Sequence, residues 1–422
     1  SGHTEHYSYT PQNLLTRRTL KSGYNIHFEW ESPHSKPGSS QSGSSSNSSS
    51  NSSSNSQPNS RCTRQWGDPV DGQPTYHYRF EWGVPSAQPN AGLVNVAIDS
   101  RGARTEYQFN AQGLPTFERD PLGATSHTRY NSNGQVLQHT NALGHTEHFQ
   151  YNSEGHLQAY TNTQGQQHRF ELNAQGQVLK HHHPAGPVRS NSYTPEGLLA
   201  SHTDATGATT RYRYNSLGLL CEITNPLGQI TRLLYNARGQ AQARIDALGQ
   251  HTTYHYDAWA RLARITNPLG RSTHYAYDLM GRCTRASDHE GLATHYSYSP
   301  LGQPERIIDP TGRSTVYEYA DKLSQPTARI DAQGFTLRYR YDSERNLIEL
   351  HNENGQSCQF EYDLAERLTR QTGFDGYTQT HQYNAAGHLL QTRHWAPGST
   401  PQIADTEPEN NAGNSIGNNA AQ

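Results

Sequence analysis

A 21-residue pattern repeats through most of this chain, and it constrains the fold more than any other feature. RYRYNSLGLLCEITNPLG, residues 211–228, returns 21 residues later as RLLYNARGQAQARIDALG. Aligned on its turn residues, the pattern gives 14 units in continuous register, with one extra residue in the unit that begins at Asp309. A fixed period of this length indicates a repeat architecture, in which each unit is one supersecondary element. The units begin at Asp99, Asp120, Asn141, Asn162, His183, Asp204, Asn225, Asp246, Asn267, Asp288, Asp309, Asp331, Asn352 and Gly373.

Two positions of the unit, which reads DxxGxxTxYxYNxxGxLxxxT, are nearly constant. The fourth is glycine in all 14 units, and the eleventh is tyrosine in twelve, with Phe109 and Leu172 as the exceptions. A second glycine stands at the fifteenth position in most units, with Ala260, Arg345 and Glu366 among the departures. We expect structural roles for the fourth-position glycines and eleventh-position tyrosines, among them Gly102, Gly123, Gly144, Gly207, Gly228, Gly249, Gly270, Gly291, Gly312, Tyr130, Tyr151, Tyr214, Tyr235, Tyr256, Tyr277, Tyr298, Tyr319, Tyr341, Tyr362 and Tyr383.

Each unit predicts two short strands and two turns. Thr, Tyr and Tyr at the seventh, ninth and eleventh positions alternate with polar residues such as Arg211 and Arg213, which is the period of a strand with one buried face. In the DxxG and NxxG segments, Asp or Asn caps its own backbone and glycine accepts a positive φ, so both segments are turn signals.

The odd period limits how these strands can pair. Because side chains alternate between the two faces of a strand, two turns of equal parity would send Tyr214 and Tyr235 to opposite faces. We therefore expect one odd loop, with the eleventh position opposite the seventeenth, and one even loop, with the seventeenth opposite the ninth of the next unit. Tyr, Tyr, Leu and Thr would then line one face as a continuous stripe.

Fourteen units make 28 strands, which at about 4.8 Å per strand would extend about 130 Å. Open twisted sheets seldom exceed about ten strands without curling. The fold class that we expect is therefore all-β, with tandem β-hairpins forming a curled, spiralling antiparallel sheet. A propeller is an alternative because two units approach the length of a blade, but odd and even units look alike. A parallel β-helix is another, although its coils would not need hairpin glycines at two places in every turn.

The composition fits a thin sheet better than a thick core. Only 31% of residues are hydrophobic and the mean hydropathy is −0.96, values that would otherwise suggest disorder. Tyrosine (26) far outnumbers phenylalanine (9), and tyrosine combines a large apolar ring with a hydroxyl that tolerates a wet edge. Half-buried strands can be built from such residues.

Charge and hydropathy exclude several classes of partner. The formal charge of −3 gives no net attraction to nucleic acid or acidic lipid, and no run of 18 apolar residues predicts a membrane span. We recognise no signal peptide. The chain starts at Ser1 inside a repeat, so we expect it to be a fragment. The widely spaced Cys62, Cys221, Cys283 and Cys358 predict single, half-buried thiols rather than a disulfide framework.

Two segments fall outside the repeat. Residues 32–60 are dominated by Ser and Asn and predict a flexible linker, and residues 397–422 predict a disordered tail. GHTEHYSYTPQNLL, residues 2–15, already matches the repeat from its fourth position onward. We therefore expect residues 1–31 to start the architecture, the linker to be an insertion in it, residues 61–98 to be pre-repeat strands, and residues 99–396 to hold the fourteen units.

The tandem YxYNxxGxLxxIT(D/N)PLG unit resembles the YD repeat of Rhs (rearrangement hot spot) proteins. FEW followed by RCTRQWGD, residues 61–68, resembles the segment before the repeats in their bacterial core. The resemblance covers roughly residues 1–395 apart from the linker. It implies a hollow β-sheet cocoon that encloses a C-terminal toxin domain in polymorphic toxins, many of them delivered by type VI secretion. Others resemble toxin-complex C subunits, and the animal teneurins carry a related shell.

This chain departs from that family at one point. Family members usually end the core in a DPxGL-type motif, where an internal protease cuts, and then continue into the toxin. Here DPLGA at residue 120 and DPTGR at residue 309 are ordinary repeat turns, and neither the closing motif nor a toxin domain is recognised. The resemblance therefore implies a shell piece, truncated or displaced.

Candidate chemistry is outweighed by structural explanations. His181, His182 and His183 form the one local histidine cluster, but a metal site needs converging ligands with second-shell support, so we expect solvated surface histidines. Recurring acids such as Asp120, Asp204, Asp246 and Asp309 occupy turn positions where a carboxylate accepts backbone N–H bonds. No GxSxG, HExxH or phosphate-cradling glycine loop is present.

The sequence thus favours a non-enzymatic β-shell that sterically shields a polypeptide, with no cofactor and no metal. Expected partners are a toxin polypeptide as cargo and secretion spike or adaptor proteins, with no nucleic acid and no membrane span, and the protein would be secreted or delivered from a bacterial cell. The alternative is a surface module, like an adhesin, that binds carbohydrate or a receptor. Rows of tyrosine could stack sugars, although we expect the rings to pack against Leu and Thr of the adjoining strand.

Overall fold

The computed structural model describes residues 4–31, 60–70, 72, 75–88, 92–320 and 322–399. The expected linker, apart from Ser60, and the expected tail beyond residue 399 lie outside the described residues. Within the described ranges no helix has the length and hydropathy that a membrane span requires.

The described chain forms 34 strands in one sheet, and each strand pairs antiparallel with the next strand along the chain. Before the first full unit the strands are β1 (His6–Tyr9), β2 (Leu15–Thr19), β3 (Asn25–Glu31), β4 (Arg61–Gly67), β5 (Tyr78–Pro85) and β6 (Leu93–Ile98). The units contribute β7 (Arg104–Phe109), β8 (Pro115–Arg119), β9 (Thr125–Tyr130), β10 (Val136–Thr140), β11 (Thr146–Tyr151), β12 (Leu157–Thr161), β13 (Gln167–Leu172), β14 (Val178–His182), β15 (Val188–Tyr193), β16 (Leu199–Thr203), β17 (Thr209–Tyr214), β18 (Leu220–Thr224), β19 (Ile230–Tyr235), β20 (Ala241–Ile245), β21 (His251–Tyr256), β22 (Leu262–Thr266), β23 (Ser272–Tyr277), β24 (Cys283–Ser287), β25 (Ala293–Tyr298), β26 (Pro304–Ile308), β27 (Ser314–Glu318), β28 (Ala328–Ile330), β29 (Thr336–Tyr341), β30 (Leu347–His351), β31 (Ser357–Tyr362), β32 (Leu368–Thr372), β33 (Thr378–Tyr383) and β34 (Leu389–Trp395).

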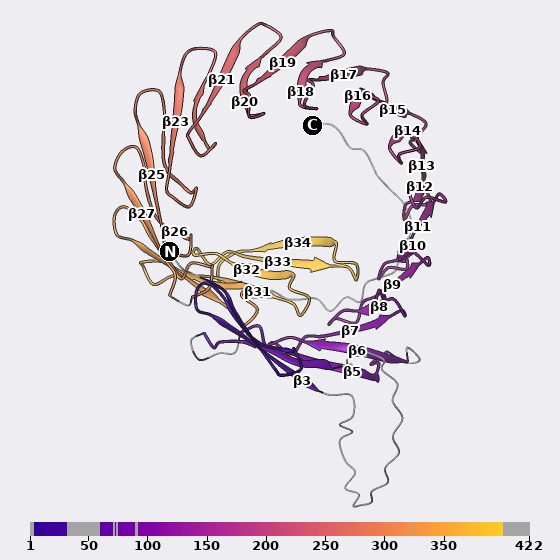
Figure 1. Cartoon of the computed structure of the whole chain (residues 1–422). Helices are drawn as coiled ribbons and strands as arrows, with labels where there is room; N and C mark the ends of the chain where they lie inside the picture. Colours follow the sequence, from indigo (N-terminus) through magenta and orange to yellow (C-terminus); the bar gives the residue numbers. More distant parts are fainter. Residues whose placement is uncertain are drawn as a thin grey trace, which may run out of the picture.

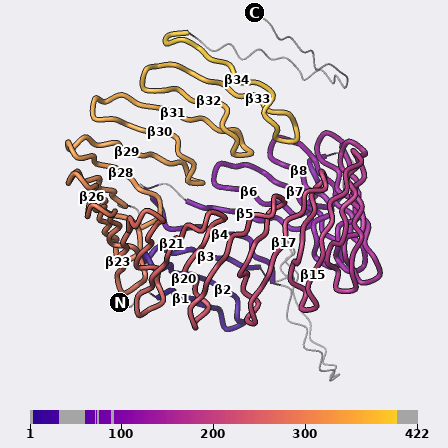
Figure 2. The backbone as a smooth tube through the Cα atoms, turned by 90° about the horizontal axis from the view of Figure 1, so that it is seen from above, coloured from indigo at the N-terminus to yellow at the C-terminus, as the bar shows by residue number. Residues whose placement is uncertain are grey.

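The sheet curls into a ring that continues past one full turn (Figure 1). The strands climb one side from β8 to β18, cross at β19 to β21 and descend through β23 to β27. The last strands, β31 to β34, return beside β5 to β8, and Figure 2 shows this second turn stacked against the first. The all-β, spiralling antiparallel fold is therefore confirmed, and one continuous meander of strands excludes both the propeller and the parallel β-helix.

The expected difference in parity between the two turns is wrong. Five residues separate β17 from β18, and five separate β18 from β19. Parity is restored by a β-bulge, because Tyr214 pairs with Leu220 but Arg213 already pairs with Glu222. The seventeenth position also does not face the ninth of the next unit, since the β18–β19 ladder holds only the pairs from Glu222↔Arg232 to Thr224↔Ile230.

The face alternation that follows from this register still gives one continuous stripe. Tyr214 lies opposite Leu220, Ile223 lies opposite both Tyr212 and Thr231, and directly paired side chains share a face. Tyr214 and Tyr235 consequently face the same side, as expected. The bulge therefore keeps the tyrosines of successive units on one face, an effect that we had expected from an even loop. No turn signal in the sequence indicates the bulge.

The hydrophobic core is small, because the sheet is a single layer over most of its length. A buried cluster forms around Val94, Val96 and Phe117 in β6 and β8, with Val84 and Ile98 packed against it. Along the repeats the stripe residues are half-buried instead. One face of the wall is thus apolar without being covered by the described part of its own chain.

Candidate functional site

The DxxG turns hold the fourth-position glycines in the left-handed region. The nine glycines named above have φ between +77° and +91°, a region that favours glycine because it has no Cβ. In the turn that begins at Asn225, the Gly228 N–H donates to the Asn225 carbonyl (2.9 Å), while the Asn225 Oδ1 accepts the N–H groups of Leu227 and Gln229. Asp or Asn and Gly are therefore required together by one turn geometry.

The four recurring acids lie in these turns. Asp120, Asp204 and Asp246 each use Oδ1 to accept the backbone N–H groups two and four residues later. Asp309 does the same and also accepts the hydroxyl of Thr311 and the Nε–H of Arg313. The Thr311 hydroxyl and the Arg313 guanidinium lower the pKa of Asp309 to about 2. These carboxylates do not converge as catalytic pairs; they cap turns.

A pH dependence follows from the lowered pKa of Asp309. A carboxylate of depressed pKa contributes stability that is present above its unfolded pKa, near 3.9, and is lost as the pH falls toward its folded pKa of about 2. In Asp309→Asn, whose amide oxygen can cap the turn but does not titrate, the melting temperature should fall less between about pH 4 and pH 2. Acid titrations of both proteins by circular dichroism measure this, and identical profiles would contradict it.

The eleventh-position tyrosines connect neighbouring units. In eleven of the twelve, the hydroxyl donates to the backbone carbonyl 15 residues earlier, at the seventeenth position of the preceding unit, over 2.7–3.1 Å. Tyr214, for example, donates to the Leu199 carbonyl (2.9 Å). Tyr256 is the eleventh-position tyrosine without this bond. The carbonyl lies beyond the short ladder between units, so the hydroxyl satisfies a group that the backbone leaves open. This explains tyrosine rather than phenylalanine.

Removing one of these hydroxyls should weaken the repeat array. Tyr214→Phe deletes the donor and leaves the Leu199 carbonyl without it, so we expect a loss of about 1 kcal/mol in the free energy of unfolding. Tyr256→Phe is the matched control and should cost little. Urea denaturation of the two variants measures the difference, and equal losses would argue against the role of the hydroxyl.

Arginines at the sixteenth position form a second link between units, which the sequence analysis missed. Arg261 stacks on the Tyr277 ring (4.9 Å to the centroid), pairs with Asp257 (2.7 Å) and donates to the Asp278 carbonyl of the next turn (2.7 Å). Arg282 and Arg367 repeat this arrangement on Tyr298 and Tyr383. Recurrence of Arg before the seventeenth position, opposite an Asp at the twelfth, was the signal available in the sequence.

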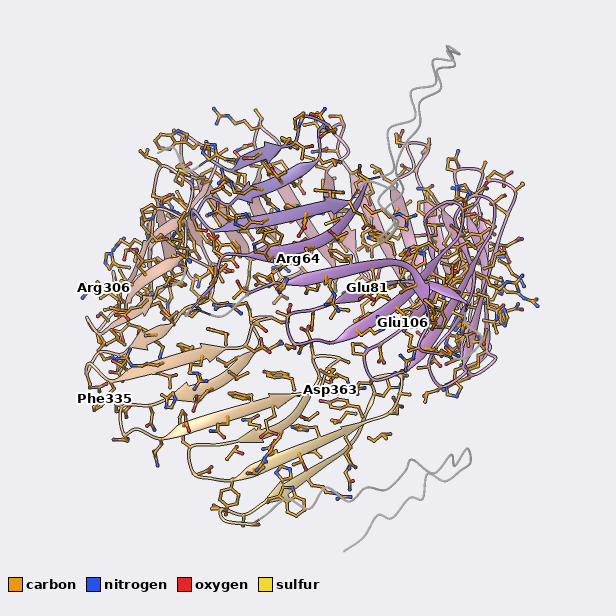
Figure 3. The ribbon with its side chains drawn as sticks, turned by 90° about the horizontal axis from the view of Figure 1, so that it is seen from below. Arg64, Glu81, Glu106, Arg306, Phe335 and Asp363 are labelled. Carbon is orange, nitrogen blue, oxygen red and sulfur yellow. The ribbon has the colours of Figure 1, made fainter. Side chains whose placement is uncertain are left out.

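Contacts between residues about 250 positions apart join the first winding of the ring to the second, and we call this line of contacts the seam. The turn between β6 and β7 meets the turn between β29 and β30: the Glu344 carboxylate accepts the N–H and the hydroxyl of Ser100, and the hydroxyl of Tyr78 (2.8 Å). Arg101 pairs with Asp99 (2.7 Å) and, across the seam, with Glu366 (3.2 Å). Figure 3 shows the second turn, with Asp363, lying against the strands that carry Glu106.

Three carboxylates gather at this seam. One oxygen each of Asp99, Glu344 and Glu366 lie within 4.8 Å of one another. They accept hydrogen bonds from Arg101, Ser100 and Tyr78. Burial, together with the Glu344 carboxylate, raises the pKa of Tyr78. The group therefore serves as a cross-link between the turns of the sheet.

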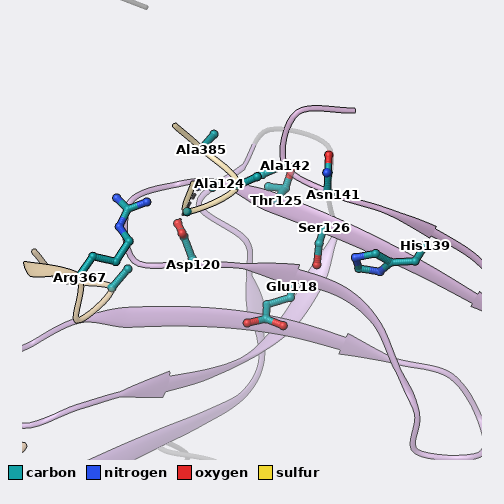
Figure 4. Close-up of a pocket in the computed structure, with 13 residues that line it drawn as sticks. Glu118, Asp120, Ala124, Thr125, Ser126, His139, Asn141, Ala142, Arg367 and Ala385 are labelled. Atoms are coloured by element: carbon teal, nitrogen blue, oxygen red, sulfur yellow. Dashed lines mark hydrogen bonds between the residues drawn. The ribbon is translucent and has the colours of Figure 1, made fainter. Parts of the chain in front are cut away.

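A cavity of about 340 Å³ adjoins the seam. Figure 4 shows it between Asp120 and Ser126 of the first turn and Arg367 and Ala385 of the second. Its residues come from hairpin ends and not from a converging set of reactive groups. We find in it no constellation for nucleophilic or acid–base catalysis among the described residues.

The structure separates His182 from the two histidines beside it. His182 contacts Glu171 (2.7 Å), whereas His181 stacks on His168 from the neighbouring strand, and His183 lies edge-on to the same ring. His181 is half-buried, which differs from the solvated position that we expected. The cysteines are free: Cys62, Cys221 and Cys283 are half-buried as expected, and Cys358 is buried.

Comparisons with known proteins agree on the repeat and the fold. The family model described as RHS Repeat matches residues 130–167, 193–230, 256–293 and 298–336. No curated protein matches the sequence. Among solved structures, the crystal structure of TcdB2-TccC3-TEV is similar, with a TM-score of 0.60 and 14% identity over 93% of this chain and 22% of that chain.

Two further solved structures are similar with a lower TM-score. One is the Tc holotoxin pore of Photorhabdus luminescens and the other is TcdB2-TccC3 without its hypervariable C-terminal region, each with a TM-score of 0.50 and 15% identity over 93% of this chain and 25% of that chain. The chain spans about a quarter of the length of the solved chains that it matches. The repeat motif and the RHS Repeat model, which matches four stretches of the chain, therefore support an Rhs/YD-repeat protein, and the similar solved structures share its fold.

Proposed function

We propose that the protein is a non-catalytic shell scaffold that encloses and shields a toxin polypeptide. The single observation that carries the proposal is the ring itself: one sheet curls past a full turn and is fastened to itself at the seam through Arg101 and Glu344 (Figure 1). A wall that is locked in this way can hold a polypeptide by steric exclusion.

The half-buried face of the wall supports the same proposal. Tyr212, Tyr214 and Ile223 lie on one face and remain half-buried in the single-layered sheet, so a partner chain would find apolar surface there. One of the similar solved structures is a Tc holotoxin pore, which supports a toxin as the cargo. We propose delivery from a bacterial cell, with a secretion spike or adaptor protein as further partner and type VI secretion as one route.

The segments have corresponding roles in this proposal. Residues 99–396 make the wall, residues 1–31 and 61–98 begin it, residues 32–60 are an insertion and residues 397–422 a tail. The fourth-position glycines and eleventh-position tyrosines serve the wall and not a reaction, because the glycines shape the turns and the tyrosine hydroxyls bind backbone carbonyls.

Protease protection tests the shell proposal. A protease-sensitive polypeptide fused after Gln422 of the full chain should be digested at least ten times more slowly than the same polypeptide free in solution. Opening the seam with Arg101→Met should restore fast digestion. Equal digestion of fused and free polypeptide would overturn the proposal, since a wall that excludes nothing is not a container.

A surface-binding module is the second candidate. It is favoured by exposed apolar residues at the hairpin ends of neighbouring units: Trp259 is 71% exposed, Leu279 96% and Met280 69%. A glycan array probed with the full chain tests it, with Trp259→Ala as the variant. Saturable binding that Trp259→Ala abolishes would favour this candidate over the container.

A further inference from the structure

Three imidazole rings converge on one face of the wall. His168 in β13 and His181 in β14 stack with their ring centroids 5.2 Å apart, and the His168 Nδ1 lies 3.0 Å from the His181 Nε2. His183, in the turn after β14, lies 4.9 Å from His168 and 6.3 Å from His181, measured between ring centroids. The three residues come from a strand, its neighbour and the following turn, so the fold brings them together although the sequence separates His168 by 13 residues from His181.

The repeat itself does not require these histidines. They occupy the seventh, twentieth and first positions of their units. The seventh is most often threonine and the first is usually Asp or Asn, whereas the twentieth varies, with isoleucine at residues 223, 265 and 307 and histidine at residues 139, 181 and 202. Those residues fold into the same strands and turns elsewhere in the wall. Examples are Thr210 and Thr231, Ile223 and Ile265, and Asp204 and Asn225. His168 and His183 therefore depart from the common residue at positions that meet in space with His181, and this indicates a role beyond the fold.

The nitrogen spacing suits a transition metal. His168 Nδ1 and His181 Nε2 are 3.0 Å apart and share a hydrogen bond. Two ligand nitrogens on a tetrahedral ion with bonds of about 2.0–2.1 Å stand about 3.4 Å apart, so an ion that replaced the hydrogen of this bond would need only a small separation of the two rings. An imidazole must be neutral to coordinate.

The surroundings hold the pair in place and set its preference. Tyr160 stacks on His168 (5.6 Å) and Phe170 on His181 (4.9 Å), so both imidazoles lie between aromatic rings. The Tyr160 hydroxyl donates to Glu147 (2.9 Å). Arg189 in β15 lies directly opposite His181 in the strand register. Nitrogen ligands favour Zn²⁺, Cu²⁺ or Ni²⁺ over Mg²⁺ and Ca²⁺. The positive charge of Arg189 opposes any cation, and only directional coordination offsets it.

We propose that His168, His181 and His183 form a binding site for a divalent transition metal that fastens β13 to β14 and to the turn that follows. His168 Nδ1 and His181 Nε2 are the first two ligands. The His183 Nδ1 accepts the Ala185 N–H (3.1 Å), so its Nε2 is the third ligand, brought in by rotation of this exposed side chain. His182 contacts Glu171 instead and takes no part.

Zinc and nickel titrations of the full chain test this site. The variants replace each histidine by a residue that other units carry at that position, His168→Thr and His181→Ile, so that the strands should fold as they do in those units. We expect one saturable site by calorimetry, a rise in melting temperature on adding Zn²⁺ or Ni²⁺, and at least tenfold weaker binding in either variant. His182→Ala should bind as the unchanged protein does.

A variant that should bind the metal more tightly provides a second test. Arg189→Thr also restores the usual seventh-position residue but removes a positive charge beside His181, so it should tighten metal binding several-fold. Unchanged titrations in His168→Thr and His181→Ile would overturn the proposal and assign any binding to other histidines. Loss of binding in those two variants with no gain in Arg189→Thr would overturn the assignment of His181, the ligand that faces Arg189.

Discussion

Alanine at Gly67 should destabilise the start of the sheet by about 3 kcal/mol, near the upper end for overpacking. Gly67 ends β4, and a Cβ added there would lie 1.8 Å from the Tyr24 hydroxyl oxygen and 2.6 Å from the ring carbon that carries it. Tyr24 is 1% exposed and its hydroxyl is bonded to Thr75, so the ring has nowhere to move. Gly67 does not have a positive φ, and the cost is therefore steric and not conformational.

Chemical denaturation of Gly67→Ala measures this loss, and a double-mutant cycle isolates its cause. In a Tyr24→Leu background the hydroxyl and the far ring carbons are gone, so adding Gly67→Ala should cost little more. A full additional loss in that background would show that the methyl group meets something other than Tyr24.

Local features of the wall could be read from the sequence because they repeat. Each unit carries the Asp or Asn and the Gly of its turn in the same five residues, and its tyrosines in one strand, so strand positions, turns and the shared face follow from short-range chemistry. The exception is instructive. The bulge beside Tyr214 leaves no composition signal, because the extra residue, Cys221, is simply unpaired between Leu220 and Glu222, and we misassigned its effect to an even loop.

Contacts across the seam could not be read in this way. The number of strands in one winding of the ring decides which hairpin turns meet across the seam. That number depends on small twists summed over many strands. Nothing near Glu344 indicates that its partner is Ser100, and nothing near His168 marks His181 as its neighbour. The sequence therefore predicts the wall, whereas the structure is needed to find its closure and the histidine site.

Replacing Arg101 by methionine should open the seam. Arg101 has a side chain only 16% exposed and neutralises a group of three carboxylates, those of Asp99, Glu344 and Glu366. Without it, three negative charges remain within 4.8 Å of one another. Removing one partner of a fully buried ion pair costs about 3–5 kcal/mol; because Asp99 is half-buried and Glu366 is exposed, we expect a smaller loss of about 2 kcal/mol here. The lost free energy comes from contacts across the seam. We therefore expect β29 to β34 to become more mobile, while β9 to β26 keep their strand pairing.

Hydrogen exchange separates this local opening from general unfolding. In Arg101→Met, amides around residues 76–101 and 342–366 should lose protection by at least tenfold, and those of β17 to β20 should be unchanged. Glu353→Ala, in an exposed turn away from the seam, is the charge-changing control and should alter neither region. Uniform loss of protection around the whole ring would mean instead that the wall is a single cooperative unit, in which closure and strand pairing cannot be separated.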